Sequence, residues 1–212
     1  MKIGITQRVE YNAQNAEVRD CLDHRWISIF DKLNMHIIPI PNKIRKINVW
    51  LDNFKCDALI LSGGNDLAIL PNAKNAFLHR DQTENDILKY AQSKSIPVLG
   101  VCRGFQLMNT YFGGSLKKVT GHVATRHNIY WRFNQNEEYI KRDVNSFHEW
   151  GVLKNDLSKQ LIPCAFDDGG NIEAARHKKL NMLGIMWHPE REKDFNKLDL
   201  DIFRTLFSGG FF

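Results

Sequence analysis

The stretch Pro97–Asn109, PVLGVCRGFQLMN, joins two different patterns with no linker between them. Pro97–Val101 is a short apolar run typical of a buried strand, and Phe105–Phe112 repeats apolar residues at helical spacing. Cys102 lies at the junction, with a glycine two residues to either side of it. A strand that turns directly into a helix exposes one side chain at the carboxyl end of the sheet and needs small neighbours. The pattern therefore predicts a tight turn that presents the Cys102 thiol.

The chain around this junction alternates between strand-like and helix-like segments. Apolar runs predict strands at Lys2–Thr6, Met35–Pro41 and Cys56–Ser62, and helical spacing predicts helices at 18–33, around 47–51 and at Asp81–Lys94. After 113–114 strand-like runs follow with few helical gaps, at Asn128–Phe133, Tyr139–Val144, Leu161–Phe166, Ile172–Arg176 and Met182–Trp187. Strands that alternate with helices form parallel sheets covered on both faces. We expect an α/β fold with a mostly parallel central sheet flanked by helices, added antiparallel strands and a last helix within Asp194–Phe207.

The 212 residues have the composition of a globular protein, 43% hydrophobic and 25% charged. Because no repeat, low-complexity tract or linker interrupts them, we expect one domain over residues 1–212. No apolar stretch approaches the roughly 18 residues of a transmembrane helix, and the first residues are too poor in apolar side chains for a signal peptide. The cysteines, Cys21, Cys56, Cys102 and Cys164, form no CxxC pair. Neither a zinc site nor a disulfide framework is expected, and a cytoplasmic location fits.

The net charge of +5 raises the question of a nucleic-acid partner. Nucleic-acid-binding modules usually concentrate basic residues in one stripe or tail, whereas here they are spread from Lys2 to Arg204 and mixed with acids. A solvated basic surface is the simplest interpretation, and an anionic small-molecule substrate is the alternative. We do not expect nucleic acid to be bound.

Cys102 could be a small buried core residue, unless a base is available to activate it. Among the eight histidines His188 is the best candidate, because it ends the apolar run LGIMW and has Glu190 two residues on to orient its ring. His122 and His127 lie in the loop-like stretch GHVATRHN and could line a site. The histidines expected to be solvated are His24, His36, His79 and His177.

Together, CRGFQ at 102–106 and GIMWHPE at 184–190 resemble the class I glutamine amidotransferase family, and more narrowly its stand-alone γ-glutamyl hydrolase branch. Further matches to that branch cover most of the chain: LSGGND at 61–66, RDQTE at 80–84, NSFH at 145–148 and IEA at 172–174. The resemblance implies the flavodoxin-like sheet of that family. It also implies hydrolysis of a γ-glutamyl amide with no metal and no cofactor.

The resemblance implies a role for each matching residue. Cys102 is the nucleophile, His188 the base and Glu190 the acid that orients it, while backbone N–H groups of Gly64 and Arg103 form the oxyanion hole. The implied substrate-binding residues are Gly63, Gln106, Asn145, Ser146, Phe147 and His148. We interpret Arg80, Asp81 and Glu84 as structural.

One departure bears on the substrate. Where the branch usually has N-S-x-H-H-Q, this chain has NSFHEW at 145–150, beside the expected pocket for the departing amine. The loops expected around the nucleophile, at 7–11, 117–132 and 148–150, carry an excess of positive charge from Arg8, Lys117, Lys118, Arg126, His127 and Arg132. A phosphate-bearing leaving group would gain charge-assisted hydrogen bonds there.

With this positive charge, the chain resembles the type of γ-glutamyl hydrolase that releases cytidine diphosphoramidate from γ-glutamyl-CDP-amidate in capsule biosynthesis. Hydrolysis of γ-glutamyl-aminobutyrate or folate polyglutamate is the alternative. Two other classes remain: a glutaminase subunit that supplies ammonia to a synthetase, and a binding protein that has lost its chemistry. The sequence leaves the oligomeric state open, and the apolar end Phe211-Phe212 has no explanation.

Overall fold

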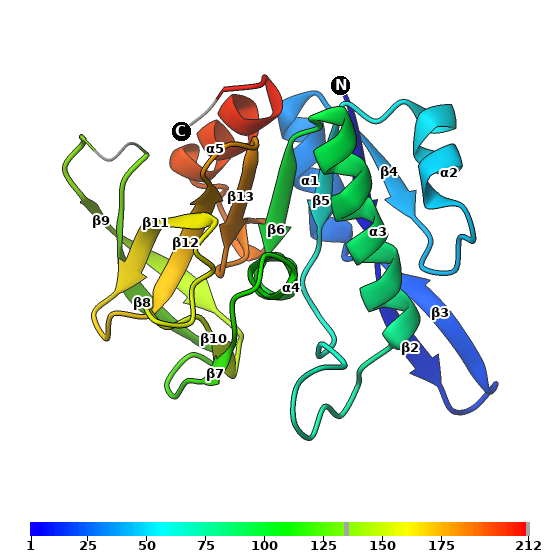
Figure 1. Cartoon of the computed structure of the whole chain (residues 1–212), viewed down its shortest axis with the longest axis horizontal. Helices are drawn as coiled ribbons and strands as arrows, with labels where there is room; N and C mark the ends of the chain where they lie inside the picture. Colours follow the sequence, from blue (N-terminus) through cyan, green and yellow to red (C-terminus); the bar gives the residue numbers. More distant parts are fainter. Residues whose placement is uncertain (134–135, 211–212) are drawn as a thin grey trace.

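A nine-stranded sheet runs through the molecule in the order β4-β1-β5-β6-β13-β12-β11-β8-β9 (Figure 1). The computed structural model describes residues 1–133 and 136–210, so the Phe211-Phe212 end lies outside the described residues. The parallel strands are β4 (His36–Ile40), β1 (Lys2–Thr6), β5 (Ala58–Leu61), β6 (Val98–Val101) and β13 (Met182–Ile185). The antiparallel strands are β12 (Ile172–His177), β11 (Leu161–Asp167), β8 (Thr125–Trp131) and β9 (Ile140–Ser146). The predicted parallel sheet with an antiparallel extension is confirmed.

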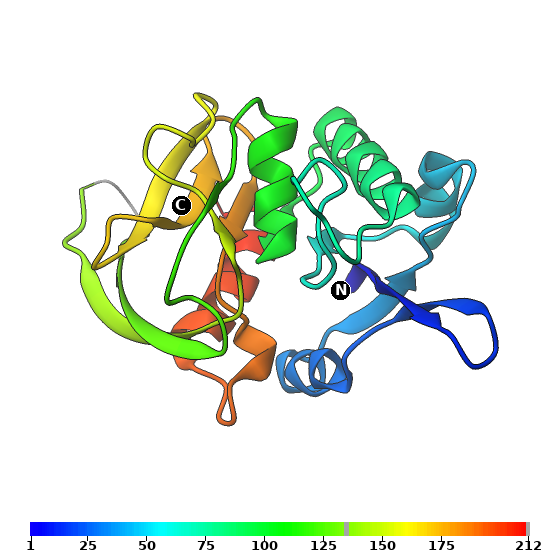
Figure 2. The same ribbon diagram turned by 90° about the horizontal axis from the view of Figure 1, so that it is seen from below.

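Helices cover both faces of the sheet, as Figure 2 shows. One face carries α1 (His24–Leu33) and α5 (Lys197–Phe207), and the other carries α2 (Ile47–Phe54), α3 (Leu78–Lys94) and α4 (Arg103–Tyr111). Successive strand residues point to opposite faces, so Ile60 packs into the core under α1 and α5, and Leu61 into the core under α2, α3 and α4. Within the described residues, every helix is too short or too polar to span a bilayer.

The segment before α1 differs from the prediction. Helical spacing indicated one helix over 18–33, but β2 (Arg8–Asn12) and β3 (Glu17–Cys21) form an antiparallel hairpin that projects from the body of the molecule (Figure 2). Residues 8–11, expected in a loop, belong to this hairpin. The Asp23 side chain accepts a hydrogen bond from the backbone N–H of Arg25 at 2.9 Å, which caps α1 and fixes its start. Val18 is 56% exposed, so its apparent helical spacing reflected no packed face.

Smaller elements complete the fold around the sheet. β7 (Lys117–Lys118) pairs with β10 (Trp150–Gly151), and the 3-10 turn η1 (Pro189–Arg191) follows β13. The expectation that His177 is solvated is wrong: it is 6% exposed, and its Nδ1 accepts hydrogen bonds from the backbone N–H groups of residues 179 and 180. All four cysteines are free thiols, as predicted.

Candidate active site

The predicted tight turn lies between β6 and α4, with Cys102 at its tip. Cys102 has φ 51° and ψ −105°, a backbone conformation that side chains other than glycine rarely adopt. Its N–H donates to the Ile185 carbonyl at 2.7 Å, and its own carbonyl accepts from Gln106 N–H at 3.0 Å. A Cβ at Gly104 would lie 2.0 Å from the Leu61 carbonyl oxygen, so only glycine fits there. The surrounding structure therefore holds the cysteine in a strained position at the first turn of a helix.

His188 reaches this turn because β13, which it follows, is the parallel neighbour of β6. Its Nδ1 lies 2.7 Å from Glu190 Oε1, and Cys102 lies close enough to act on the charge of the ring. Gly63 packs directly on the imidazole, since a Cβ at that position would lie 2.6 Å from His188 Cε1. All three side chains of this Cys–His–Glu arrangement are buried.

Two opposing effects set the charge of His188. Burial lowers the pKa of this imidazole, but the negative charges of Glu190 and Cys102 and their hydrogen bonds outweigh it and raise the pKa to about 9. At neutral pH the ring is thus an imidazolium beside the sulfur. By contrast, burial lowers the pKa of His148 to about 3, so that ring stays neutral and cannot form the same ion pair.

The side chains of Asn145 and Ser146 hold backbone segments of the site. Asn145 Nδ2 donates to the His188 carbonyl at 2.8 Å, and Asn145 Oδ1 accepts from the His188 N–H at 3.0 Å. Ser146 Oγ donates to the carbonyl of His122 at 2.7 Å. Neither residue occurs among the described residues that line the cavity next to Cys102. Their predicted contact with the glutamyl group stays a prediction. The observed contacts indicate that Asn145 positions the backbone of His188 and that Ser146 positions the backbone of His122.

A cavity of about 290 Å3 opens beside Cys102. Of the residues singled out from the sequence, it is lined by Gly64, Cys102, Arg103, Gln106, Phe147, His148 and His188. The cavity is also lined by residues of the matched or expected stretches 61–66, 117–132 and 145–150, namely Asn65, Asp66, Val123, Glu149 and Trp150. Lining residues that the sequence analysis missed are Leu70, Asn75 and Arg191. The Arg191 guanidinium lies 4.4 Å above the Phe147 ring, which is itself edge-on to His188. Arg191 directly follows Glu190 in the sequence, and this position could have indicated that Arg191 lines the site.

The basic residues expected around the leaving group are mostly elsewhere. Lys117, Lys118, Arg126, His127 and Arg132 do not occur among the described lining residues of this cavity. The Arg126 side chain forms ion pairs with two carboxylates, one from β9 and one from the segment after η1. His127 Nε2 lies 3.5 Å from a carboxylate oxygen in β12. The prediction that these five basic residues face the leaving group was wrong, because their segments place them away from the cavity. Two of them, Arg126 and His127, lie beside carboxylates instead.

A second hollow adjoins the cavity and carries the remaining predicted cation, Arg8. This groove of about 550 Å3 shares the lining residues Gly64, Asn65 and Asn75 with the cavity. Its other walls come from the β2–β3 hairpin and from the loop before α3: Arg8, Val9, Glu10, Tyr11, Lys74 and Phe77. Cations and aromatic rings therefore lie next to the cavity that holds Cys102.

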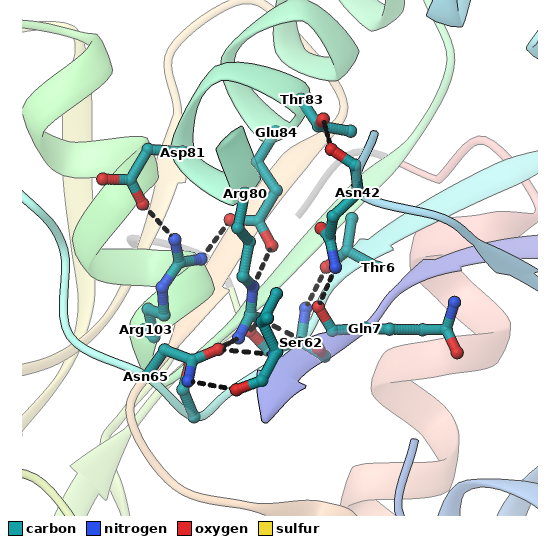
Figure 3. A network of polar contacts seen from close by, with 12 residues as sticks. Thr6, Gln7, Asn42, Ser62, Asn65, Arg80, Asp81, Thr83, Glu84 and Arg103 are labelled. Atoms are coloured by element: carbon teal, nitrogen blue, oxygen red, sulfur yellow. Dashed lines mark hydrogen bonds and ion pairs between the residues drawn. The ribbon is translucent and has the colours of Figure 1, made fainter. Parts of the chain in front are cut away.

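A buried ion network connects the glycine loop at 62–65 to the tight turn between β6 and α4 (Figure 3). Arg80 donates to the carbonyls of Ser62, Gly63 and Gly64 at 2.8, 3.1 and 2.5 Å. Arg80 also pairs with Glu84 at 3.1 Å, and the same carboxylate together with Asp81 binds Arg103. The structural interpretation of the RDQTE motif is consistent with these contacts.

This network bears on the expected oxyanion hole. Residue 103 is the first of α4, and the first N–H groups of a helix have no intrahelical acceptor. The backbone N–H of Arg103 lies at the start of α4, and the backbone N–H of Gly64 lies in the glycine loop. Arg80 and Glu84 connect these two segments. Such fixed N–H groups can stabilise a negative oxygen next to the sulfur.

A strained strand–cysteine–helix turn with a buried His–Glu pair at the carboxyl ends of parallel strands defines an amidohydrolase of the class I glutamine amidotransferase type. Comparison with protein families agrees: Peptidase C26 matches residues 3–190. The chain belongs to the Peptidase C26 family.

The chain is also similar to individual proteins. The chain is 34% identical to gamma-glutamyl-CDP-amidate hydrolase of Campylobacter jejuni, over 94% of this chain and 95% of that one. It is 31% identical to a glutamine amidotransferase-like protein of Lactococcus lactis, over 87% and 86%. Among solved structures, a GMP synthase component from Thermoplasma acidophilum superposes with a TM-score of 0.70 at 21% identity, covering 98% of this chain and 92% of that chain. The last likeness concerns the fold.

Proposed function

We propose that this chain is a cysteine-dependent γ-glutamyl hydrolase and that its substrate is γ-glutamyl-CDP-amidate. The products are glutamate and cytidine diphosphoramidate. The observation that carries the proposal is the similarity, along nearly the whole of both chains, to gamma-glutamyl-CDP-amidate hydrolase. The Cys–His–Glu arrangement next to a cavity supports the reaction class.

In the proposed mechanism the Cys102 thiolate attacks the γ-carbonyl carbon, and the N–H groups of Arg103 and Gly64 bind the resulting oxyanion. Because His188 Nδ1 is bound to Glu190, the proton on His188 Nε2 is the one that can pass to the leaving nitrogen. The C–N bond breaks and the amidate departs, which leaves a glutamyl thioester. Water, deprotonated by His188, then attacks the thioester and releases glutamate and the thiolate.

The groove beside the cavity supports a large anionic leaving group. Arg8 and Lys74 offer cations for a diphosphate, although Glu10 pairs with Arg8 and offsets part of its charge. Tyr11, 59% exposed, and Phe77 offer aromatic faces on which a base can stack. Ammonia from glutamine would use none of these groups, and aminobutyrate would use few of them.

The direct test compares kcat/KM for γ-glutamyl-CDP-amidate, γ-glutamyl-aminobutyrate and glutamine, with glutamate release as the readout and the Cys102→Ala variant as the blank. We expect γ-glutamyl-CDP-amidate to be cleaved fastest, with an advantage that shrinks at high salt because salt screens exposed charges. Faster cleavage of γ-glutamyl-aminobutyrate with no salt effect would exclude the proposed substrate and keep the hydrolase. Activity on glutamine that requires an added synthetase would instead support the role of supplying ammonia to that synthetase.

We further propose that the enzyme works in the cytoplasm and that its substrates are small anionic molecules. The four unpaired cysteines support this location, because thiols remain reduced there.

A further inference from the structure

Three histidines surround one buried carboxylate on the antiparallel side of the sheet. His122 from the loop before β8, His127 from β8 and His148 from the segment after β9 all face Glu173 of β12. Glu173 Oε1 lies 3.6 Å from His122 Nδ1 and 3.8 Å from His148 Nε2, and the three residues offer ligand atoms that all lie within 4.8 Å of one another. His122, His148 and Glu173 are 5%, 4% and 1% exposed. The cluster is therefore shielded from water.

Each imidazole of His122 and His148 has one nitrogen toward Glu173 and one nitrogen away from it. The partner of the nitrogen that points away determines whether the nitrogen toward Glu173 carries a proton or a lone pair. His148 Nδ1 lies 3.1 Å from the Trp150 carbonyl, which can only accept, so Nδ1 carries the proton and Nε2 does not. His122 Nε2 lies 3.1 Å from Asp167 Oδ2, which likewise only accepts, so the free lone pair of His122 is on Nδ1. The Asn171 amide also lies near His122 Nε2, but it donates to Asp167 at the shorter distance of 2.8 Å.

Three acceptors thus converge without a donor between them. In the described structure, His122 Nδ1, His148 Nε2 and Glu173 Oε1 have no hydrogen-bond partner, although each is buried. Buried acceptors that face one another repel, and each one left unsatisfied destabilises the fold. A cation between the three atoms would remove both penalties at once.

We propose that His122 Nδ1, His148 Nε2 and Glu173 Oε1 bind a zinc ion or a similar first-row divalent cation. Zinc takes imidazole and carboxylate ligands at about 2.0–2.2 Å in tetrahedral geometry, which separates the ligand atoms by about 3.4 Å. The observed 3.6 and 3.8 Å to Glu173 Oε1 require a contraction of a few tenths of an ångström, and the two histidine nitrogens, which lie within 4.8 Å of each other, would have to approach to the same separation. Metal-binding histidines almost always give their second nitrogen to a carboxylate or carbonyl, and here Asp167 and the Trp150 carbonyl occupy that place.

The position of the cluster indicates a supporting role for the ion. His148 lines the active-site cavity, and its backbone N–H donates to the His122 carbonyl at 3.0 Å. An ion bound to His122, His148 and Glu173 would fasten this wall of the cavity to β12. A bound ion here would contradict the expectation from the sequence that the chain has no zinc site. The inference does not depend on which γ-glutamyl amide is cleaved.

The test measures zinc by mass spectrometry in the full-length chain after removal of metal with EDTA, addition of zinc chloride and gel filtration. Every sample carries Cys102→Ala, because a reactive thiolate also binds zinc. We expect about one zinc per chain, and a rise in Tm of roughly 5–10 °C at about a hundredfold excess over Kd. His122→Asn and Glu173→Gln should weaken zinc binding by more than about 100-fold. Asp167→Asn, which removes only an outer partner, should weaken it by about 10–100-fold.

His24→Asn is the matched control, because His24 is exposed and should leave zinc binding unchanged. Circular dichroism identifies variants that do not fold. X-ray absorption of the zinc-loaded protein with His122, His148 and Glu173 unchanged tests the proposal independently of the variants. We expect its spectrum to show two imidazoles and a carboxylate oxygen bound to zinc. Substoichiometric zinc, equal binding in a folded His122→Asn variant, or a sulfur ligand would overturn the proposal. A failure here leaves the hydrolase proposal untouched, since glutamate release is measured separately.

Discussion

The charge of His188 makes turnover depend on pH in a specific way. The pKa of this imidazole is raised to about 9, and in the proposed mechanism the protonated ring gives its proton to the leaving nitrogen. We therefore expect kcat/KM to fall as pH rises through about 9, because the imidazolium is lost. Glu190→Gln removes a negative charge, so the pKa of His188 should drop and the alkaline limb should move to lower pH. A pH–rate profile of both proteins checks this, and an unmoved limb would contradict the pairing.

The same pKa shift predicts how the stability of the substrate-free protein depends on pH. A histidine whose pKa rises on folding, from about 6.5 to about 9, stabilises the fold fully below pH 6.5. That contribution is lost as pH rises toward 9. We expect the free energy of unfolding, measured with denaturant, to decline over this window more steeply in the wild type than in Glu190→Gln. Equal slopes would mean that Glu190 does not hold the charge on His188.

The four cysteines should differ in reactivity toward iodoacetamide at neutral pH. Burial raises the pKa of Cys56 and Cys164 to about 11, which disfavours their thiolates. Burial and nearby Glu10 raise the pKa of Cys21. Cys102 instead lies beside an imidazolium, so peptide mapping should find it alkylated first, and His188→Asn should slow that reaction. Equal labelling of all four cysteines would argue against the ion pair.

At the scale of residues, the sequence predicted what local geometry determines. Cys102, His188 and Glu190 each lie in a short motif whose backbone shape follows from neighbouring glycine or proline, and all three meet in the structure. The cluster of His122, His148 and Glu173 could not be predicted, because its members come from three segments whose pairing depends on the whole antiparallel sheet.

At the scale of elements, α3 carries a buried cation that anchors the glycine loop at 62–65. Arg80 binds three successive carbonyls of the glycine loop and pairs with Glu84. Arg80→Met should cost about 3–5 kcal/mol of stability, since it leaves a buried carboxylate short of a partner. It should also lower kcat by about 100-fold or more, because the loop that carries the proposed oxyanion-binding N–H of Gly64 loses its anchor.

Arg204→Met is the control for that change. Its guanidinium forms an exposed ion pair with Asp201, which is worth little. Denaturant unfolding gives the stability of each variant, and kcat is measured on the folded fraction. If Arg80→Met destabilised the fold but kept full kcat, the network would serve stability alone.

Helices and strands with a packed face were predicted to within a few residues, as for α3 and β6. The β2–β3 hairpin was not, because its side chains are largely exposed and only β2 alternates polar with apolar residues, over a single stretch of five residues. Its position beside Gly64 depends on long-range contacts such as the bond between Asn65 Oδ1 and the Val9 N–H, at 2.8 Å. A local pattern cannot indicate a strand that is ordered by a partner 56 residues away.

At the scale of the molecule, the alternation of strands and helices was sufficient to predict the central sheet. The shape of its binding surface was not, because hollows form where loops from distant segments meet. A larger hollow, about 830 Å3, lies between α3 and the loop that holds Lys43, and shares no described lining residue with the Cys102 cavity. The smaller groove next to the cavity is therefore the better place for a leaving group, since the reacting bond must reach Cys102.

The two hollows can be told apart by substitution. Lys74 lies in the groove that adjoins the cavity, and Lys43 lies in the larger, separate hollow. Lys74→Ala should raise KM for γ-glutamyl-CDP-amidate by about three- to tenfold, because one exposed charged contact to a phosphate is worth about 1 kcal/mol. It should leave KM for γ-glutamyl-aminobutyrate unchanged, and Lys43→Ala should affect neither substrate. Steady-state kinetics at low salt checks this. An effect of Lys43→Ala confined to the nucleotide substrate would instead place the nucleotide in the larger hollow.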